Sequence, residues 1–320
     1  MKKIIVTGGS GFLGSHLCDY LIKNNNYVIC IDNLYSSNIN NIKHLTKNKN
    51  FQFIEQDITL PFNFIADEIY NLACPASPIY YQNDPVKTIK TNVSGSLNVL
   101  DLAYKTNAKV LLASSSEVYG DPIEHPQNET YWGNVNPIGI RSCYDEGKRC
   151  AETLFFDFFR QYNLKIKVIR IFNTYGPNMS INDGRVISNF VVQAIQNKPL
   201  TIYGNGEQTR SFCYVDDLIN GLVKMMDSND KITGPINLGN PYECQIKYIA
   251  KKIIELTKSK SSIVNKSLPK DDPLKRKPDI HKSRKLLNWE PVILLELKWL
   301  YWVSPLKKTA RICGIPKSPI

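Results

Sequence analysis

The sequence predicts an α/β protein in which a doubly wound parallel β-sheet is joined to a smaller, mixed α/β lobe. Three observations indicate this fold. Strand and helix patterns alternate through the first two thirds of the 320 residues. A glycine-rich turn follows the first strand, and after about residue 173 the patterns become short and mixed. Such alternation is typical of parallel sheets, because each crossover helix covers one face.

The expected elements follow in order along the chain. Residues 4–6 are apolar and β-branched, as in a buried parallel strand, and a glycine turn and a helix follow. A long helix at 84–107 begins with Asp84-Pro85, a good N-cap and first-turn pair. The other expected strands are 27–31, 51–56, 68–73, 109–113, 166–172, 200–203 and 211–214, and the other helices are 143–162, 188–197, 216–227 and 245–259.

Composition narrows the class of protein. The net charge of +11 comes from 40 Lys+Arg and 29 Asp+Glu, but the lysines are scattered among asparagines, as in residues 40–50. This favours a solvated surface with a few phosphate ligands over nucleic-acid binding. The eight cysteines form no Cys-x-x-Cys pair, which indicates free thiols in a reducing compartment rather than disulfides or a zinc site. No run of about 18 apolar residues exists, and a strand begins at residue 3. We therefore expect a cytoplasmic protein without signal peptide, membrane span or metal.

The glycine turn predicts a dinucleotide site. Gly8, Gly11 and Gly14 recur every third residue, and glycine lets backbone N–H groups approach a pyrophosphate at a helix start. The second strand ends at Asp32, about 20 residues on, where an acid meets the adenosine ribose. The next residue is Asn33 and not an arginine, and Asp32 would repel the extra phosphate of NADP. The pattern favours NAD and a Rossmann-type domain; the alternative is that Asp32 only begins a loop.

A tyrosine and a lysine lie one helical turn apart. Tyr144 and Lys148 are four residues apart, so both side chains lie on one helix face. An ammonium near a phenol is expected to lower the phenol pKa, so Tyr144 can take a proton from a substrate hydroxyl while hydride leaves to a nicotinamide. Ser115, after the preceding strand, is placed to hydrogen-bond the same oxygen. A surface pair is the alternative, and the glycine turn at the amino terminus counts against it.

Two further motifs, residues 114–117 and 173–177, follow directly on expected strands, where ligands bind in such folds. Together with the glycine turn and Tyr-x-x-x-Lys, they resemble the extended short-chain dehydrogenases/reductases that act on nucleotide sugars. Longer stretches resemble the UDP-glucuronate decarboxylase (UDP-xylose synthase) family over about residues 1–292. These stretches are 71–78, 114–121, 125–127, 131–139, 143–148, 170–177, 183–186, 208–212 and 276–280.

The resemblance implies a reaction. NAD oxidises the C4 hydroxyl of UDP-glucuronate with Tyr144 as base, and the resulting β-keto acid loses CO2 because its electrons flow into the new carbonyl. The site then stabilises that oxygen and protonates C5, and the bound NADH returns hydride to give UDP-xylose. The alternatives are a 4-epimerase, a 4,6-dehydratase, an oxidative decarboxylase that releases the 4-keto pentose, and a binding protein that has lost turnover.

Glu117 distinguishes among these relatives. Sugar 4,6-dehydratases usually present Asp-Glu where this chain has Ser116 and Glu117, and epimerases lack the glutamate. The resemblance therefore favours decarboxylation and implies that Glu117 lies near C5, where it handles the proton or the carboxylate. The alternative is that Glu117 caps a helix or loop.

The resemblance also implies binding residues. Arginine binds phosphates and carboxylates bidentately; Arg276 is expected on the active-site side of the substrate, and Arg185 and Arg210 near cofactor or nucleotide phosphates. Further expected substrate contacts are Asn173, Ser188, Tyr203 and, by a looser match, Lys90. Further expected cofactor contacts are Phe12, Leu13, Asp57, Ile58, Leu72, Thr91 and Thr174. Members of the superfamily usually dimerise through the long helix and the Tyr/Lys helix, so we expect a homodimer.

We expect three regions along the chain. They are an NAD-binding domain at 1–173, to which later segments can return, a mainly substrate-binding lobe at 174–292, and a divergent tail at 293–320. The resemblance ends after Trp289-Glu290-Pro291, and a basic, proline-bearing tail follows. Two hypotheses stay open: a reading frame shifted near residue 293, or a genuine tail that packs or touches a membrane surface.

Overall fold

The computed structural model describes residues 1–267 and 275–293. Seven strands form its central sheet: β1 (Lys3–Thr7), β2 (Tyr27–Asp32), β3 (Phe51–Glu55), β4 (Glu68–Asn71), β5 (Lys109–Ser115), β6 (Ile166–Ile171) and β11 (Ile236–Leu238). All are parallel, in the order β11-β6-β5-β4-β1-β2-β3. The order reverses between β1 and β4, so the expected doubly wound sheet is confirmed. The last strand, β11, comes from beyond residue 173.

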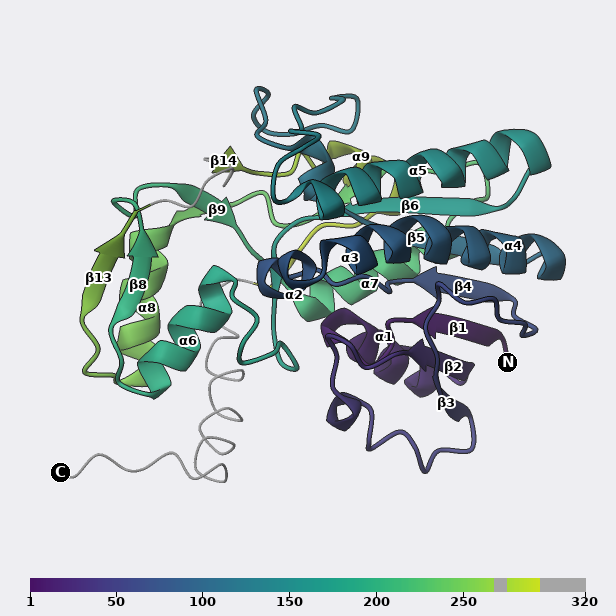
Figure 1. The fold of residues 1–320 in the computed structure, drawn as a ribbon, viewed down its shortest axis with the longest axis horizontal. Helices are drawn as coiled ribbons and strands as arrows, with labels where there is room; N and C mark the ends of the chain where they lie inside the picture. Colours follow the sequence, from purple (N-terminus) through teal and green to yellow (C-terminus); the bar gives the residue numbers. More distant parts are fainter. Residues whose placement is uncertain (268–274, 294–320) are drawn as a thin grey trace.

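Helices cover both faces of the sheet (Figure 1). Those on one face are α1 (Phe12–Lys23) and α7 (Val215–Asp227); those on the other are α3 (Pro85–Lys90), α4 (Ser96–Thr106) and α5 (Ser142–Tyr162). Ile4 and Val6 of β1 join the core on the α1 side, whereas Ile5 joins the core on the α4 side. Burial on both faces explains why the strand pattern is continuously apolar.

The helix expected at 84–107 is interrupted. It consists of α3, a π-helical stretch at Thr91–Gly95, and α4. A Cβ on Gly95 would come within 2.6 Å of the Ile58 side chain, and one on Gly147 of α5 within 2.8 Å of Asn92. These close approaches come from other parts of the chain, so helical periodicity could not predict the π turn. π turns are common at functional sites, and Thr91 faces the cavity described below.

In its described residues, the smaller lobe contains three small sheets and two helices (Figure 1). Its elements are β7 (Thr174–Tyr175), α6 (Val186–Ile195), β8 (Leu200–Tyr203), β9 (Thr209–Ser211), β10 (Cys213–Tyr214), β12 (Glu243–Gln245), α8 (Ile246–Thr257), β13 (Ile263–Lys266) and β14 (Lys275–Arg276). The strand expected at 211–214 is two strands, because the chain changes partner at residue 212: β9 pairs with β12 and β14, and β10 pairs with β7. Short helices α2 (Pro78–Asn83) and α9 (His281–Leu287) complete the described fold.

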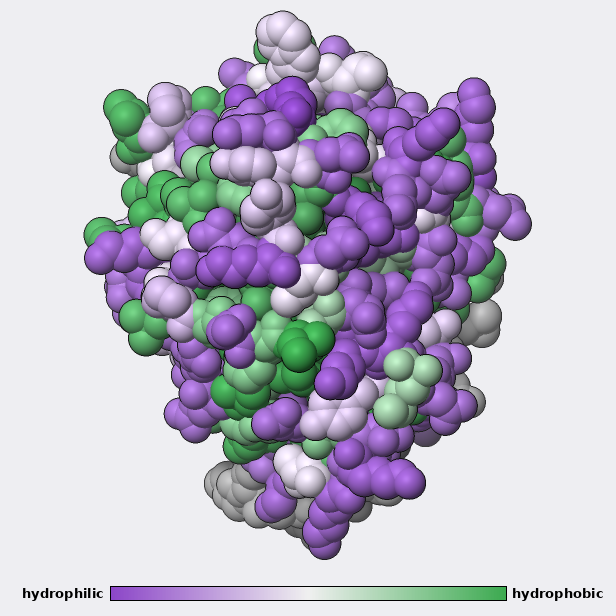
Figure 2. Space-filling view, turned by 90° about the vertical axis from the view of Figure 1, so that its right-hand side faces the viewer, coloured by the Kyte–Doolittle hydropathy of each residue, from purple (hydrophilic) through white to green (hydrophobic). Residues whose placement is uncertain are grey.

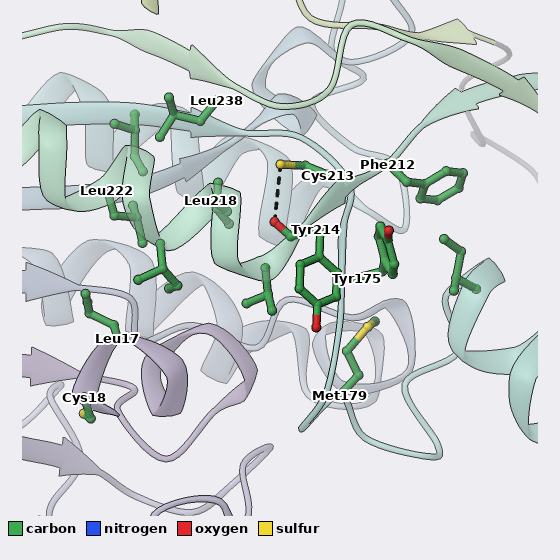
Figure 3. Packing of buried hydrophobic residues seen from close by; sticks show 14 of the residues in the cluster. Leu17, Cys18, Tyr175, Met179, Phe212, Cys213, Tyr214, Leu218, Leu222 and Leu238 are labelled. Atoms are coloured by element: carbon green, nitrogen blue, oxygen red, sulfur yellow. Dashed lines mark hydrogen bonds between the residues drawn. The ribbon is translucent and has the colours of Figure 1, made fainter. Parts of the chain in front are cut away.

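One hydrophobic core joins the sheet to the smaller lobe. Leu17 of α1 and Leu218 of α7 belong to the same buried cluster as Tyr175, Met179 and Phe212 (Figure 3). The central sheet and the smaller lobe therefore share one packed core. Because protein cores are densely packed, this core holds the side chains that each part contributes to a site.

Trp289 fastens the last described segment to α7. Its indole is 2% exposed, and Nε1 donates to the backbone oxygen of Asp217 at 2.9 Å. The N–H groups of Val292 and Ile293 donate to the Asp217 carboxylate at 3.2 and 2.9 Å. The expected divergent tail, 293–320, lies outside the described residues from 294 onwards.

The side on which the strands begin is largely hydrophilic (Figure 2). Lys2 pairs there with Glu68 at 2.6 Å, and Lys109 pairs with Asp230 at 2.7 Å. These two lysines are thus paired with carboxylates, of which Glu68 is buried and Asp230 is exposed. Within the described part of the chain, no helix has the length and hydropathy that crossing a membrane requires.

We predict that Trp289→Ala lowers the free energy of unfolding by about 3–5 kcal/mol, because removing a buried aromatic side chain leaves a cavity. Urea unfolding followed by circular dichroism measures the change. Trp132→Ala is the matched control, since Trp132 is 88% exposed, and its stability should change by less than about 0.5 kcal/mol. Equal midpoints for the two variants would contradict the role assigned to Trp289.

Candidate active site

A cavity of about 990 Å3 lies between the carboxyl ends of the central strands and the smaller lobe. Every residue expected at the site lines this cavity except Lys90 and Ser188. Lys90 is exposed on α3, and Ser188 is 2% exposed and donates its hydroxyl to the backbone oxygen of Arg185 at 2.8 Å. The fold therefore brings together groups from both halves of the chain. Within the described residues, no three His, Cys, Asp or Glu side chains gather to hold a metal ion.

The glycine turn leaves room for a ligand at the start of α1. Gly8 has a φ of +69°, and a Cβ there would lie 2.9 Å from the backbone of Ala73. A Cβ on Gly14 would lie 2.2 Å from the Gly8 carbonyl oxygen, so α1 can pack on the turn only with glycine here. Gly11 is the N-cap residue of α1, and no side chain in the described structure caps the helix. Its first N–H groups are therefore available to a phosphate.

Asp32 hydrogen-bonds both the glycine turn and the loop that follows β2. It is 7% exposed, and one carboxylate oxygen accepts from the N–H of Ser10 at 3.0 Å. The other accepts from the N–H of Leu34 at 2.9 Å and from the Ser37 hydroxyl at 2.7 Å. Asp32 thus organises the following loop as well as facing the cavity. Residues 33–38 include neither lysine nor arginine, so the wall suits a ribose diol better than a 2′-phosphate.

Lys87, not Lys90, is the lysine of α3 that lines the cavity. Its Nζ lies 3.1 Å from Asp57 Oδ2 and 5.0 Å from the ring centroid of Tyr35. Although burial raises the pKa of Asp57, hydrogen bonds from Thr59 and other donors lower it to about 2. The two lysines are three residues apart on α3, so a match along the sequence could not tell which one turns inward.

Tyr144, Lys148 and Ser115 meet where β5 ends. Tyr144 and Lys148 are 6% and 4% exposed; Lys148 Nζ lies 5.8 Å from the Tyr144 ring centroid and donates to the Ala113 carbonyl oxygen at 2.9 Å. Ser115, which is 8% exposed, acts to lower the pKa of Tyr144. Burial raises the pKa of Tyr144 and lowers that of Lys148. The expected direction for Tyr144 is wrong for the protein by itself, because the cost of desolvating the buried phenolate exceeds the opposing effects of its neighbours.

Glu117 is held between two arginines. Arg276, 2% exposed on β14, places Nη1 3.2 Å from Glu117 Oε1 and also donates to the Ser116 hydroxyl at 3.1 Å and the Gly120 carbonyl at 2.8 Å. Arg141 Nη2 donates to the other oxygen of Glu117 at 2.5 Å. Burial raises the pKa of Glu117, but the two guanidinium groups lower it to about 2. Glu117 is therefore a carboxylate at neutral pH that pairs with both arginines.

Further arginines make this end of the cavity cationic. Arg210 on β9 is in register with Arg276 on β14. Arg185 lines the same cavity and pairs with Asp183, with Nη2 2.7 Å from Oδ2. With Arg141, four of the described guanidinium groups line this cavity, which suits a ligand with several negative charges, such as a diphosphate that also bears a carboxylate.

Several buried polar atoms have no partner among the described residues. They are Tyr35 OH, Ser77 Oγ, Tyr81 OH, Arg276 Nε and Asp145 Oδ1, and all of these residues except Asp145 line the cavity. A buried polar group left unpaired costs about 1–3 kcal/mol, so these atoms indicate a ligand rich in hydrogen-bonding oxygens. Tyr81 stacks on Tyr144 with centroids 5.2 Å apart. Sequence reasoning missed Tyr81 and Arg141, since neither falls within a motif and only the fold brings them to Tyr144 and Glu117.

Comparison with known proteins agrees with this geometry. A family model described as the NAD dependent epimerase/dehydratase family matches residues 4–239. UDP-glucuronic acid decarboxylase 1 of Arabidopsis thaliana is 55% identical over 92% of this chain and 67% of its own length. UDP-glucuronic acid decarboxylase 6 of the same plant is 53% identical over 92% of this chain and 85% of its own length. UDP-glucuronic acid decarboxylase 1 of Xenopus tropicalis is 52% identical over 92% of this chain and 70% of its own length. The chain thus spans about two thirds of the length of some of these relatives.

Solved structures show the same fold. UDP-glucuronic acid 4-epimerase from Bacillus cereus, in complex with UDP-glucuronic acid and NAD, has a TM-score of 0.85 at 28% identity, covering 96% of this chain and 99% of that one. UDP-glucose 4-epimerase from Thermotoga maritima, with UDP-glucose, has a TM-score of 0.86 at 30% identity with the same coverage. The chain belongs to the NAD dependent epimerase/dehydratase family and, within it, to the UDP-glucuronic acid decarboxylases.

Proposed function

We propose that the chain converts UDP-glucuronate into UDP-xylose and CO2 through a UDP-4-keto intermediate, with NAD as its bound cofactor. The observation that carries the proposal is the Glu117–Arg276 ion pair in the same cavity as Tyr144 and Lys148. The pair of Glu117 and Arg276 suits a substrate carboxylate, and the pair of Tyr144 and Lys148 suits oxidation of a hydroxyl. Identity of 52–55% to UDP-glucuronic acid decarboxylases supports the same substrate.

The first step removes a proton and a hydride from the sugar C4. Tyr144 accepts the hydroxyl proton, and Ser115 hydrogen-bonds the same oxygen. When bound, NAD would supply the ring that accepts the hydride and later returns it. Burial raises the pKa of Tyr144, and positive charge near the phenol, such as the Lys148 ammonium, would act against that rise.

The second step breaks the bond between C5 and the carboxylate. The Arg276 guanidinium, with its Nε unpartnered among the described residues, is suited to bind that carboxylate. Glu117, which is ionised, places a second negative charge on the same guanidinium. Departure of neutral CO2 removes one of the two negative charges from this group while the electrons move into the C4 carbonyl. Tyr144, protonated in the first step, then hydrogen-bonds the developing oxyanion.

Cofactor and nucleotide contacts follow from the cavity wall. The glycine turn with Phe12 and Leu13 would bind the pyrophosphate, and Asp32 the adenosine ribose. Asp57 and its neighbours would face the adenine end. The remaining cavity-lining residues divide between nicotinamide and substrate: Leu72, Thr91, Asn173, Thr174, Arg185, Tyr203 and Arg210.

A 4-epimerase is the principal alternative, because a UDP-glucuronic acid 4-epimerase shares the fold. The pairing of Glu117 with Arg276 and Arg141 favours decarboxylation, since this ion cluster adds nothing to a simple hydride transfer at C4. Ser116, where a dehydratase has its acid, counts against dehydration.

The protein is further proposed to be a cytoplasmic homodimer. The described cysteines are all free thiols, which supports a reducing compartment. Val86 and Ile89 of α3 are 59% and 37% exposed, and Tyr104 of α4 and Tyr162 of α5 are 55% and 43% exposed with ring centroids 5.0 Å apart. Large apolar side chains on adjoining helices suit a contact with the same helices of a second copy.

The product assay tests the function. Incubation of the protein with UDP-glucuronate and NAD should release CO2 and form UDP-xylose without net NADH, as followed by NMR and absorbance. Epimerised UDP-glucuronate would indicate the epimerase. A 4-keto pentose with accumulating NADH would indicate an oxidative decarboxylase, and substrate binding without turnover a binding protein.

Tyr144→Phe should lower kcat by about 100- to 10,000-fold, since it removes the general base, while NAD binding measured by fluorescence titration is retained. Because burial raises the pKa of Tyr144, wild-type kcat/KM should rise with pH as the phenolate form becomes more populated. Tyr242→Phe, at a 69% exposed tyrosine, is the control and should match the wild type. Unchanged turnover in Tyr144→Phe would refute the mechanism.

The double variant Val86→Glu/Ile89→Glu should be monomeric, because four buried carboxylates in a symmetric helix contact cannot be solvated. Light scattering after size-exclusion chromatography gives the mass. Ile123→Glu, at an 82% exposed position on another surface, should leave the dimer intact. A wild-type monomer, or a dimeric double variant, would contradict this interface.

A further inference from the structure

Arg276 lies on a strand of only two residues. β14 pairs in parallel with β9 through Lys275 and Arg276, and the Ser211 hydroxyl donates to the Arg276 carbonyl oxygen at 3.3 Å. These contacts hold one side of the strand. A two-residue strand needs further support to keep a buried guanidinium in one place, and the residues that follow Arg276 supply it.

Gln127 binds the backbone on both sides of Pro278. Its side-chain Oε1 accepts from the N–H of Lys277 at 2.9 Å, and its own N–H donates to the Lys277 carbonyl at 2.9 Å. Its carbonyl oxygen accepts from the N–H of Asp279 at 2.8 Å. Gln127 is 0% exposed, and its Nε2 donates to the Glu124 carbonyl at 2.7 Å. All of its polar groups are therefore paired, and three of these bonds go to the segment next to Arg276.

Asn237 of β11 ties this contact to the central sheet. Its Nδ2 donates to the carbonyl oxygens of Gln127 at 3.0 Å and Asp279 at 3.1 Å. Its Oδ1 accepts from the Tyr119 hydroxyl at 2.8 Å. Like Gln127, Asn237 is 0% exposed. We call Gln127 and Asn237, with the backbone they bind, the Gln127–Asn237 junction.

The junction and Arg276 contact the same segment of the chain, the one that follows β5. Arg276 bonds back to Ser116, Glu117 and Gly120, which precede Gln127 in the same segment after β5. A shift of Gln127 would therefore move the backbone of Arg276 relative to its own partner, Glu117. Because the guanidinium is buried and pairs through several bonds, small displacements change which atoms it meets.

We infer that Gln127 is a positioning residue for the reaction: its side-chain bond to the Lys277 N–H, added to the backbone bonds to Lys277 and Asp279, holds the Arg276 guanidinium against Glu117. The inference rests on the proposed function for the identity of the step. Loss of the clamp should impair the carboxylate-dependent step and leave oxidation at C4 intact, since Tyr144, Lys148 and Ser115 lie on other elements. The oxidised sugar and NADH should then accumulate.

A double-mutant cycle tests the inference. Gln127→Met keeps the length of the side chain and removes both of its hydrogen bonds. We expect kcat for CO2 release to fall roughly 10- to 100-fold, with NADH absorbance building up during turnover. On an Arg276→Met background, the same change should cause no further loss, because the group that it positions is already absent. If the loss of kcat in the double variant equals the product of the two single losses, the inference is wrong. It is also wrong if Gln127→Met is fully active.

Gln193→Met is the matched control. Gln193 of α6 also bridges two segments, with its Oε1 accepting from the N–H of Thr201 at 3.1 Å, but it makes no contact with β14 among the described interactions. It should lower stability without NADH build-up. Should Gln127→Met fail to fold, Gln127→Asn, which keeps the amide and loses the reach to Lys277, is expected to show a smaller loss that again vanishes on the Arg276→Met background.

The product of the wild type separates this inference from the proposed function. Absence of UDP-xylose from wild-type reactions would refute the function directly. The cycle is then measured on whichever product the wild type forms, and additive losses would refute the positioning role on their own.

Discussion

A guanidinium group remains stable in a protein interior only where anions and carbonyl oxygens surround it. Arg276 is such a group: it is 2% exposed, and its partners lie about 160 residues earlier in the chain, where Ser116 and Glu117 follow β5. This requirement links the last described strand of the smaller lobe to the edge of the central sheet. The arrangement of the cavity depends on that link, because it closes one end of the space where β5 and α5 present their reactive groups.

Glu117 and Tyr144 are held in opposite protonation states at neutral pH. Two arginines lower the pKa of Glu117 to about 2, whereas burial raises the pKa of Tyr144. Neighbouring groups with pKa values pushed apart can take different parts in one reaction. The carboxylate belongs with the chemistry at the substrate carboxyl group. The phenol belongs with proton transfer at the hydroxyl, for which it needs positive charge in addition to Lys148.

The shared core explains how distant segments keep this geometry. The cluster that packs α1 against α7 continues to Tyr175 and Phe212 of the smaller lobe, and β11 joins the sheet after the chain has passed through that lobe. In sequence order, the segments of the smaller lobe therefore lie between strands of the central sheet. Asn237, on β11, lies where the sheet meets the segment that carries Arg276. This one buried amide therefore connects the packed sheet to the catalytic groups.

The sequence by itself determined what depends on local pattern: the parallel strands, the glycine turn, and the pairing of Tyr144 with Lys148, since alternation, glycine spacing and helical spacing are properties of short segments. Nearly all of the site residues that the motifs marked line the cavity. Only the tertiary structure decided that α3 turns Lys87 inward, that a π turn interrupts the long helix, and that Gln127 clamps the segment after Arg276. Each of these depends on contacts between segments far apart in the chain, and no local period records such contacts.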